Sequence, residues 1–494
     1  MKLLKKLASF MLAFAMVMAI AMPSVVMAAN DGTITITGAK DDHTFEAYQI
    51  FTGKVSGKKL SDIKWGSGVS ADGQTALGDA KVKAESLKTE GNAKEFAYTV
   101  SAYLTTTPSG SANAKDSSGN YVINGLAPGY YLVKDKDSTI TGQDSYTKFI
   151  LKVVGNATAK VKNEVPESFK KVQDKNDTEG TTTGWQDSAD WDIGDKVPFQ
   201  LTGTVASDYK DYKAAYQLVF HDTLSQGLTF DENSVKVYKN EDTTPIDRSQ
   251  YTLTNPVTDG HTFDVTIKDV KALEGTVTKI RVEYEATLNE KAVIGSKGNP
   301  NKMKMEFSNN PNSTQGLEKG ETPEDKVIVF TYKAIVNKKD SSKKPLAGAE
   351  FTLYKKYGEE WKEVKKVVAK SEDGTTFTFT GLDDGVYKLE ETKVPAEYNT
   401  MAPIEFKIEA THDELSDNPE LKTLTGNKLT GEVLFTPDTD TGTLETDVIN
   451  YKGSELPETG GMGTTVLYAA GTVMILAAAA LFLAALSDEE KSRK

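Results

Sequence analysis

The stretch Thr376-Phe377-Thr378-Phe379-Thr380 alternates polar and apolar side chains with a period of two. The same alternation runs through residues 33–37 (TITIT) and 303–307 (MKMEF). This period predicts half-buried β-strands, because successive side chains of a strand point to opposite faces of a sheet. Turn signals such as Asp373-Gly374 and Asp384-Gly385 separate the runs. The chain is therefore predicted to be all-β and built of β-sandwiches.

An internal echo predicts that domains are repeated. Residues 125–133 (GLAPGYYLV) align without gaps on residues 381–389 (GLDDGVYKL), so the first and third domains are expected to share a fold. At about 150 residues per domain, the 494-residue chain has room for about three. Polar joints that contain proline divide it, and a short helix is expected near residues 79–87. The expected domains are 29–162, 163–331 and 332–451.

Composition narrows the function. The formal net charge is −13, which argues against nucleic acid as a partner, because phosphate contacts need a basic face. The chain has no cysteine, so disulfides and thiolate chemistry are excluded. Its four histidines are scattered along the sequence, which argues against a zinc site or a Ser-His-Asp triad. No metal, cofactor or enzymatic turnover is predicted.

The N-terminal segment 1–28 reads as a secretory signal. Three lysines precede an apolar run at residues 7–22, and small residues mark a cleavage site between Ala28 and Ala29. The alternative is a first membrane helix, but the run is short and ends at Pro23. Export of the protein is therefore predicted.

The C-terminal segment 452–494 has three parts in a fixed order. The pentapeptide Leu456-Pro457-Glu458-Thr459-Gly460 precedes an apolar run at residues 464–486, and a charged tail that ends in basic residues follows. The run alone would indicate a simple membrane anchor. With the pentapeptide, the segment resembles the LPXTG cell-wall sorting signal of Gram-positive surface proteins. That resemblance implies that a sortase cleaves between Thr459 and Gly460.

The third domain carries the clearest motif. Residues 387–392 (YKLEET) match the E-box of pilin domains resembling the CnaB family, and residues 336–349 and 448–450 match that family's first and last strands. The resemblance implies an isopeptide bond from Lys338 to Asn450, promoted by Glu391. Alternation places Lys338 on the apolar face of its strand, and Lys339 is the register alternative.

The second domain offers a similar trio. Residues 166–172 (PESFKKV) resemble the opening strand of a pilin middle domain, and residues 216–222 and 303–309 each continue an apolar face to a polar residue. The expected bond joins Lys170 to Asn309 with Asp222 as the promoting acid. Lys171 and Asn310 are the alternatives, one residue away and on the opposite face.

The first domain departs from this pattern. Asp135 stands where the echo places Glu391, the strand at residues 33–37 has no lysine, and Lys40 lies beyond it. No such bond is expected in this domain. Residues 155–162 (GNATAKVK) resemble the pilin motif that ends in a Pro-Lys pair, with valine in place of the proline. The resemblance makes Lys162 the acceptor lysine for polymerisation, with Lys160 as the alternative.

Together these features resemble the major, backbone subunit of Gram-positive sortase-assembled pili. The resemblance implies tandem immunoglobulin-like β-sandwiches and a structural, non-enzymatic protein on the cell wall. Its expected partners are further copies of itself, a pilin-specific and a housekeeping sortase, ancillary pilins, peptidoglycan and host surface ligands. The alternative is a monomeric LPXTG-anchored adhesin that binds host matrix or glycans, since both classes share the signals and the sandwiches.

Overall fold

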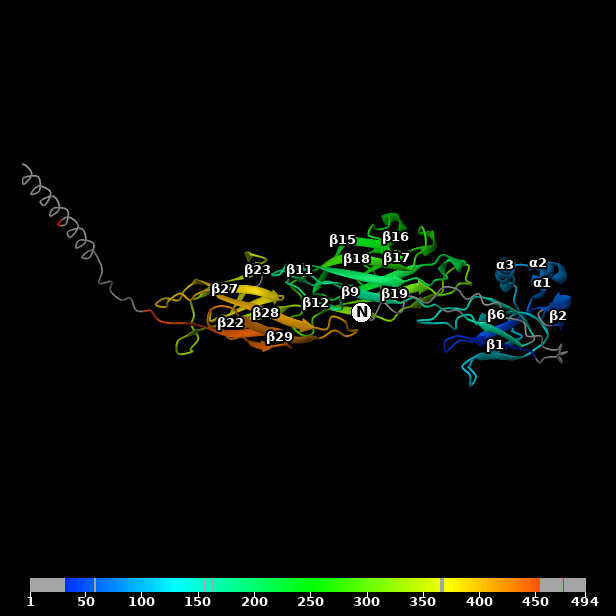
Figure 1. The fold of residues 1–494 in the computed structure, drawn as a ribbon, viewed down its shortest axis with the longest axis horizontal. Helices are drawn as coiled ribbons and strands as arrows, with labels where there is room; N and C mark the ends of the chain where they lie inside the picture. The colour runs from blue at the N-terminus through cyan, green and yellow to red at the C-terminus, as the bar shows by residue number, and fades with distance from the viewer. Residues whose placement is uncertain are drawn as a thin grey trace, which may run out of the picture.

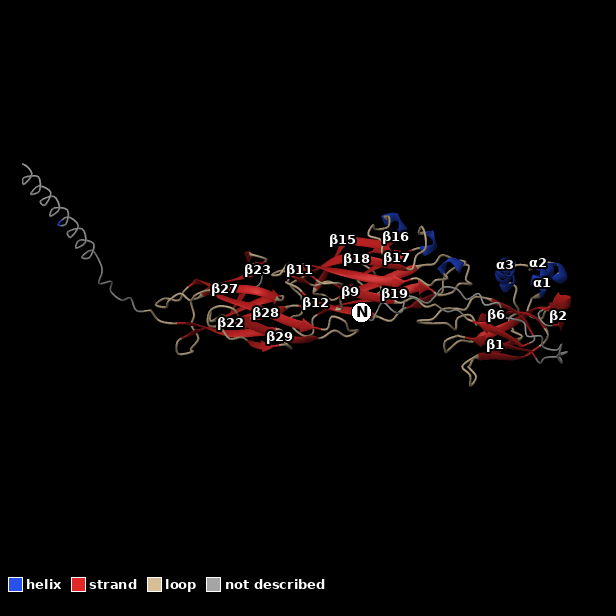
Figure 2. Ribbon diagram, in the orientation of Figure 1, coloured by secondary structure: helices blue, strands red, loops and turns tan. Residues whose placement is uncertain are grey.

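The computed structural model describes residues 32–56, 59–154, 156–161, 164–364, 368–453 and 474. These residues form three β-rich bodies in a row, with the first domain at one end and the third at the other (Figure 1). Strands dominate each body, and the α-helices gather beside the first (Figure 2). The predicted fold class of tandem β-domains is confirmed. The signal segment, Lys162 and the sorting pentapeptide lie outside the described residues.

The first domain has two sheets, ordered β5-β1-β8 and β3-β2-β6-β7, with β4 paired to β2. Its strands are β1 (Gly32–Thr37), β2 (Phe45–Ser56), β3 (Lys59–Trp65), β4 (Gly110–Ala112), β5 (Tyr121–Leu126), β6 (Gly129–Asp135), β7 (Ile150–Val154) and β8 (Asn156–Lys160). Its helices are α1 (Ala71–Leu77), α2 (Ala80–Ser86) and α3 (Glu90–Ser101).

One of these helices was expected and another was not. α2 lies where the sequence indicated a short helix, and its N-cap is Asp79, which accepts a hydrogen bond from the backbone of Val82. α3 contains Thr, Tyr and Val, which favour strands. It is helical because tertiary packing outweighs propensity, as shown by Phe96, which stacks on Phe51 of β2 with ring centroids 5.6 Å apart.

The middle domain is a sandwich of two sheets, ordered β12-β21-β19-β14-β17-β16 and β15-β18-β13-β9, with β20 paired to β19. A separate pair, β10 and β11, extends beside them. The strands are β9 (Ser168–Val172), β10 (Lys175–Asn176), β11 (Thr181–Thr182), β12 (Ser188–Asp190), β13 (Lys196–Thr204), β14 (Leu218–Leu224), β15 (Leu228–Lys239), β16 (Tyr251–Thr254), β17 (Phe263–Ile267), β18 (Lys279–Leu288), β19 (Asn299–Ser308), β20 (Lys319–Glu321) and β21 (Asp325–Phe330). Short 3-10 turns are η2 (Tyr209–Asp211), η3 (Arg248–Gln250) and η4 (Val270–Ala272).

The C-terminal domain packs two five-stranded sheets, ordered β25-β26-β22-β31-β30 and β24-β23-β27-β28-β29. The strands are β22 (Tyr332–Asp340), β23 (Glu350–Tyr357), β24 (Glu360–Glu363), β25 (Val368–Lys370), β26 (Thr376–Leu382), β27 (Gly385–Lys393), β28 (Ile404–His412), β29 (Leu421–Lys428), β30 (Thr436–Asp438) and β31 (Thr443–Asn450). Alternating apolar side chains from both sheets, such as Phe377 and Leu389, form its core.

The first and third domains share one arrangement of their terminal strands. In the first domain, β1 pairs antiparallel with β5 and parallel with β8. In the third, β22 pairs antiparallel with β26 and parallel with β31. The domain's first and last strands thus lie side by side in both. Within the described part of the chain, no helix has the length and apolar character needed to cross a bilayer.

Candidate crosslinking sites

In the C-terminal domain, β22 and β31 carry Lys338 and Asn450 into one buried site. The strands run parallel, with Lys338 opposite Val448 and Asp340 opposite Asn450. Glu391 reaches the same site from β27 in the facing sheet. All three side chains of the predicted trio are buried. The structure therefore brings together the three residues that the motif indicated.

The carboxylate of Glu391 lies close to both the amine of Lys338 and the amide of Asn450. The Nδ2 of Asn450 donates to Oε1 and Oε2 of Glu391 at 2.8 and 3.0 Å. The Nζ of Lys338 lies 3.9 Å from Oε1 of Glu391 and donates to the Val448 carbonyl at 3.2 Å. Burial lowers the pKa of Lys338 to about 8, although the charge of Glu391 opposes this shift. The amine is thus more easily neutral, as a nucleophile must be.

The neighbouring register alternative points outward. The Nζ of Lys339 pairs with the carboxylate of Asp447 at 2.6 Å, and both side chains are partly exposed. Successive residues of a strand face opposite sides, so Lys338 and Lys339 cannot both enter the core. The structure favours Lys338.

In the middle domain, Lys170 on β9 meets Asp222 on β14 across the sandwich. Both side chains are fully buried, and the Nζ of Lys170 forms a direct ion pair with Asp222. The same Nζ donates to the hydroxyl of Tyr284 on β18 at 3.1 Å. Burial lowers the pKa of Lys170 and raises that of Asp222, while the attraction between them opposes both shifts. By contrast, Lys171 is partly exposed and pairs with Asp187.

The structure does not bring Asn309 to this site, which corrects the predicted partner. Asn309 follows β19, and its Nδ2 donates to the carbonyl of Asp144 in the first domain at 3.3 Å. Asp222 lies opposite Met303. Six residues separate Met303 from Asn309, which is about 20 Å along a strand. Asn310, the alternative, lies one residue further away.

The buried amide at the site belongs to Asn301, which the sequence reasoning missed. Its Nδ2 donates at 2.7 Å to the Tyr284 hydroxyl that also accepts from Lys170. Its Oδ1 finds no hydrogen-bond partner among the described residues. Asn299, two residues earlier, already has backbone partners: its Oδ1 accepts from the N–H of Val293, and its Nδ2 donates to the carbonyls of Val293 and Val329. Asn301 shares the inward face of Met303, so continuing the alternation toward the N-terminus would have found it.

In the first domain, Asp135 binds a histidine. Its Oδ1 lies 2.7 Å from Nδ1 of His43, whose Nε2 lies 3.0 Å from Oδ2 of Asp144. Burial lowers the pKa of His43, but the hydrogen bonds and charges of both carboxylates outweigh burial and raise it to about 9. Lys40 is half exposed and reaches Asp144 only at 4.0 Å. Asp135, which aligns with Glu391 of the third domain, thus pairs with the imidazole of His43 instead of with a lysine.

A third buried lysine, Lys355, lies where the middle and C-terminal domains meet. Its Nζ contacts Asp383 of its own domain and lies 2.6 Å from Asp192 and 3.1 Å from Asp177 of the middle domain. Burial lowers the pKa of Lys355, but these carboxylates outweigh burial and raise it well above its ordinary value. A lysine held charged is a poor nucleophile, so Lys355 serves the joint between domains.

Comparisons with known proteins find related domains in two segments of the chain. Residues 193–311 match the family described as Gram-positive pilin backbone subunit 2, Cna-B-like domain. Residues 333–419 match the SpaA prealbumin-like fold domain. The matched segments contain Asp222 and Asn301 in one case and Lys338 and Glu391 in the other. The middle segment of the chain thus matches a domain of Gram-positive backbone pilins.

Individual proteins are similar to the chain in sequence or in fold. The chain is similar to the trypsin-resistant surface T6 protein of Streptococcus pyogenes serotype M6, at 26% identity over 394 residues, or 66% of this chain and 70% of the relative. Its fold is similar to the three-domain T6 backbone pilin of that species, with a TM-score of 0.58 and 21% identity over 87% of this chain and all of that one. It is also similar to the major pilin SpaD of Corynebacterium diphtheriae, with a TM-score of 0.52 and 21% identity over 86% of this chain and 98% of that one.

Proposed function

We propose that this chain is the repeating subunit of a covalently polymerised, cell-wall-anchored pilus, and that internal amide bonds close its middle and C-terminal domains. The observation that carries the proposal is the buried arrangement of Lys338, Glu391 and Asn450. A shaft one subunit wide transmits tension through every domain in series. Without cysteine, the chain needs another covalent link to resist that tension.

The reaction is balanced without any cofactor. The neutral Nζ of Lys338 attacks Cγ of Asn450, the bond from Cγ to Nδ2 breaks, and ammonia leaves with the displaced hydrogens. Glu391 contacts the amide nitrogen and lies beside the amine, so its carboxyl group is placed to carry the proton from one nitrogen to the other. One Lys–Asn amide bond forms, and the chain loses the mass of one ammonia.

The same chemistry is proposed for Lys170 and Asn301, with Asp222 as the acid. The Tyr284 hydroxyl bridges the two nitrogens, which holds the amine close to the amide. Lys170 belongs to the β9 sheet and Asn301 to the β19 sheet. A bond between them would join the two sheets of the sandwich covalently. The proposed partner replaces Asn309, which the sequence had indicated.

Polymerisation is proposed to join the Thr459 carbonyl of one subunit to the Lys162 amine of the next, through a pilin-specific sortase. A housekeeping sortase would attach the finished polymer to peptidoglycan, and ancillary pilins and host ligands would be further partners. Support comes from the sorting pentapeptide and from the match of residues 193–311, which follow the first joint, to a backbone-pilin domain. Lys160, the alternative acceptor, is an exposed residue of β8.

The test is the size distribution of the protein in cell-wall extracts. A backbone subunit gives an SDS-resistant ladder, and Lys162→Ala should reduce it to a wall-anchored monomer because the acceptor amine is lost. Lys160→Ala is the matched control and should leave the ladder unchanged. A single band from the wild type would instead support the monomeric adhesin, and a normal ladder from Lys162→Ala would move the acceptor elsewhere.

A further inference from the structure

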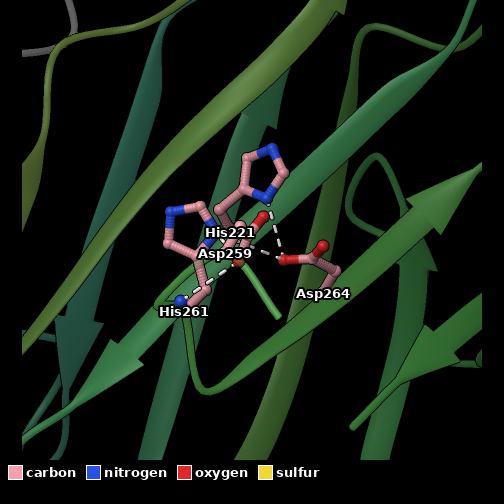
Figure 3. A group of neighbouring side chains, drawn as sticks. All are labelled: His221, Asp259, His261 and Asp264. Atoms are coloured by element: carbon pink, nitrogen blue, oxygen red, sulfur yellow. Dashed lines mark hydrogen bonds and ion pairs between the residues drawn. The ribbon is translucent and has the colours of Figure 1, made fainter. Parts of the chain in front are cut away.

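Two histidines that are forty residues apart in sequence meet on the outer face of the middle domain. His221 lies on β14 and His261 in the loop that leads into β17, and their ring centroids are 4.5 Å apart. Asp264 lies directly opposite His221 on β17, and Asp259 lies in the same loop as His261. Figure 3 shows the two imidazoles side by side with both carboxylates next to them. The scatter of histidines in the sequence had argued against such a group.

The ligand-type atoms of these side chains point toward one another. Nδ1 of His221 lies 2.8 Å from Oδ1 of Asp264, and Nδ1 of His261 lies 3.8 Å from the same oxygen. Nδ1 of His261 is also 3.0 Å from Oδ1 of Asp259, yet it forms no hydrogen bond to any described residue. One carboxylate oxygen therefore faces two imidazole nitrogens, and the nitrogen of His261 has ion-pair contacts but no hydrogen bond among the described residues.

We propose that His221, Asp259, His261 and Asp264 bind a divalent transition-metal ion of the zinc type. Imidazole nitrogen and carboxylate oxygen are ligands that zinc accepts at about 2.0–2.2 Å, so tetrahedral ligands lie about 3.3–3.5 Å apart. The four ligand atoms here lie within 4.8 Å of one another. Asp259 is half exposed and sits next to Gly260, so small side-chain adjustments close the remaining distance.

The surroundings permit a cation at this place. His221 is also opposite Lys304 on β19, whose ammonium is already paired with Glu321 at 3.0 Å. Only 11–19% of the side-chain surface of His221, Asp264 and His261 is exposed, which limits competition from water. The group thus combines two neutral donors with two negative charges, as a divalent ion requires.

Two other groups of ligand-type side chains are less suited. Asp177 and Asp192 already surround the ammonium of Lys355. His412, which lies near Asp174 and Asp190, is engaged through Nδ1 by the hydroxyl of Ser188 at 2.7 Å. Neither offers two imidazoles to one ion.

Binding would fasten the loop at residues 255–262 to the strands that support the middle crosslink. Thr262 in this loop donates its backbone N–H to the carbonyl of Asp222 at 2.7 Å, and its hydroxyl accepts from the backbone of Leu224. Asp222 faces the core, whereas His221 faces outward from the same strand. A metal on the outer face would therefore brace β14 and β17 behind the proposed reacting acid.

The experiment uses the full chain, freed of metal with EDTA and titrated with Zn²⁺ by calorimetry. Co²⁺ then serves as a spectroscopic probe, because its visible bands report the geometry of the bound ion. We expect one equivalent to bind and thermal unfolding to shift upward with Zn²⁺. The double variant His221→Gln/His261→Gln should bind at least ~10-fold more weakly, since even groups that only orient metal ligands contribute that much.

Asp242→Asn, an exposed carboxylate of the same domain, is the control and should bind as the wild type does. Thermal unfolding of the metal-free proteins checks that the variants fold. They are expected to fold, because both histidine side chains are partly exposed. The absence of Zn²⁺ binding by the wild type would overturn the proposal. So would a loss smaller than tenfold in the double variant, which would place the ion elsewhere.

Discussion

Asn450 presents its amide nitrogen to both carboxylate oxygens of Glu391, at 2.8 and 3.0 Å, with the Nζ of Lys338 only 3.9 Å from the same carboxylate. Its Oδ1 has no hydrogen-bond partner within the described residues. A buried lysine facing a buried acid is costly unless the two interact closely. Converting lysine and asparagine to an amide removes the buried amine, so the arrangement favours the crosslinked product.

Replacing Glu391 should leave the C-terminal crosslink unformed. We expect Glu391→Ala to weigh one ammonia more than the wild type, after allowance for the substitution, because no other acid among the described residues contacts both nitrogens. By analogy with a disulfide closing a loop of about 110 residues, the free energy of unfolding of the domain should fall by about 4–5 kcal/mol. Intact mass and thermal unfolding measure these effects.

Glu390→Ala is the matched control, since Glu390 faces the other side of β27 and pairs with Lys388 at 2.7 Å. It should keep the wild-type mass loss. A crosslinked Glu391→Ala protein would refute the role assigned to this acid.

A variant experiment decides whether Lys170 bonds to Asn301, in β19, or to Asn309, just after that strand. After allowance for the substitution, Asn301→Ala should show one ammonia loss fewer than the wild type. It should also lack the corresponding crosslinked tryptic peptide, because the amide carbon of Asn301 is the proposed electrophile. Asn309→Ala should keep that peptide, since its side chain contacts the first domain. Peptide mapping by mass spectrometry gives the answer, and a crosslinked peptide containing Asn309 would restore the original assignment.

The first domain should lose stability as the pH rises. The pKa of His43 is about 9 in the folded protein, against an ordinary value of 6.5. A raised pKa stabilises the fold fully below about pH 6.5, and this contribution is lost as the pH rises through 9. The difference corresponds to a free energy on the order of 3 kcal/mol.

Thermal unfolding of the wild type and of His43→Gln, followed from pH 6 to pH 10, measures this contribution. The gap between the two proteins should narrow as the pH rises, because the other titrating groups are common to both. A gap that stays constant would show that His43 is not charged in the folded protein.

Lys355 should control the joint between the middle and C-terminal domains. Lys355→Met leaves Asp177, Asp192 and Asp383 facing one another without their cation, and loss of one partner of a buried ion pair costs about 3–5 kcal/mol. We expect a lower unfolding temperature and faster proteolysis near the joint. Lys356→Met is the control, because Lys356 is more exposed and its one ion pair among the described residues is with Glu359, at 3.7 Å. Equal behaviour of the two variants would contradict the assigned role.

The sequence alone predicted the β-strands and the three residues of the C-terminal site. Alternation with a period of two assigns each residue to a face, which is why it favoured Lys338 over Lys339 and Lys170 over Lys171. The E-box and the echo then located Glu391 and Asp135. These signals are local, so they survive without knowledge of how the sheets pack.

The residues that lie opposite them depend on how the sheets pack together. Asn301 in β19 and Asn309 just after it have the same place in the alternation, which cannot say which of them the facing sheet meets. The position depends on how the β9 sheet is set against the β19 sheet, which brings Lys170 and Tyr284 to Asn301. The partners of His43 and Lys355, and the meeting of His221 with His261, likewise join segments far apart in the chain. Such contacts arise from packing and loop paths, for which the sequence carries no periodic signal.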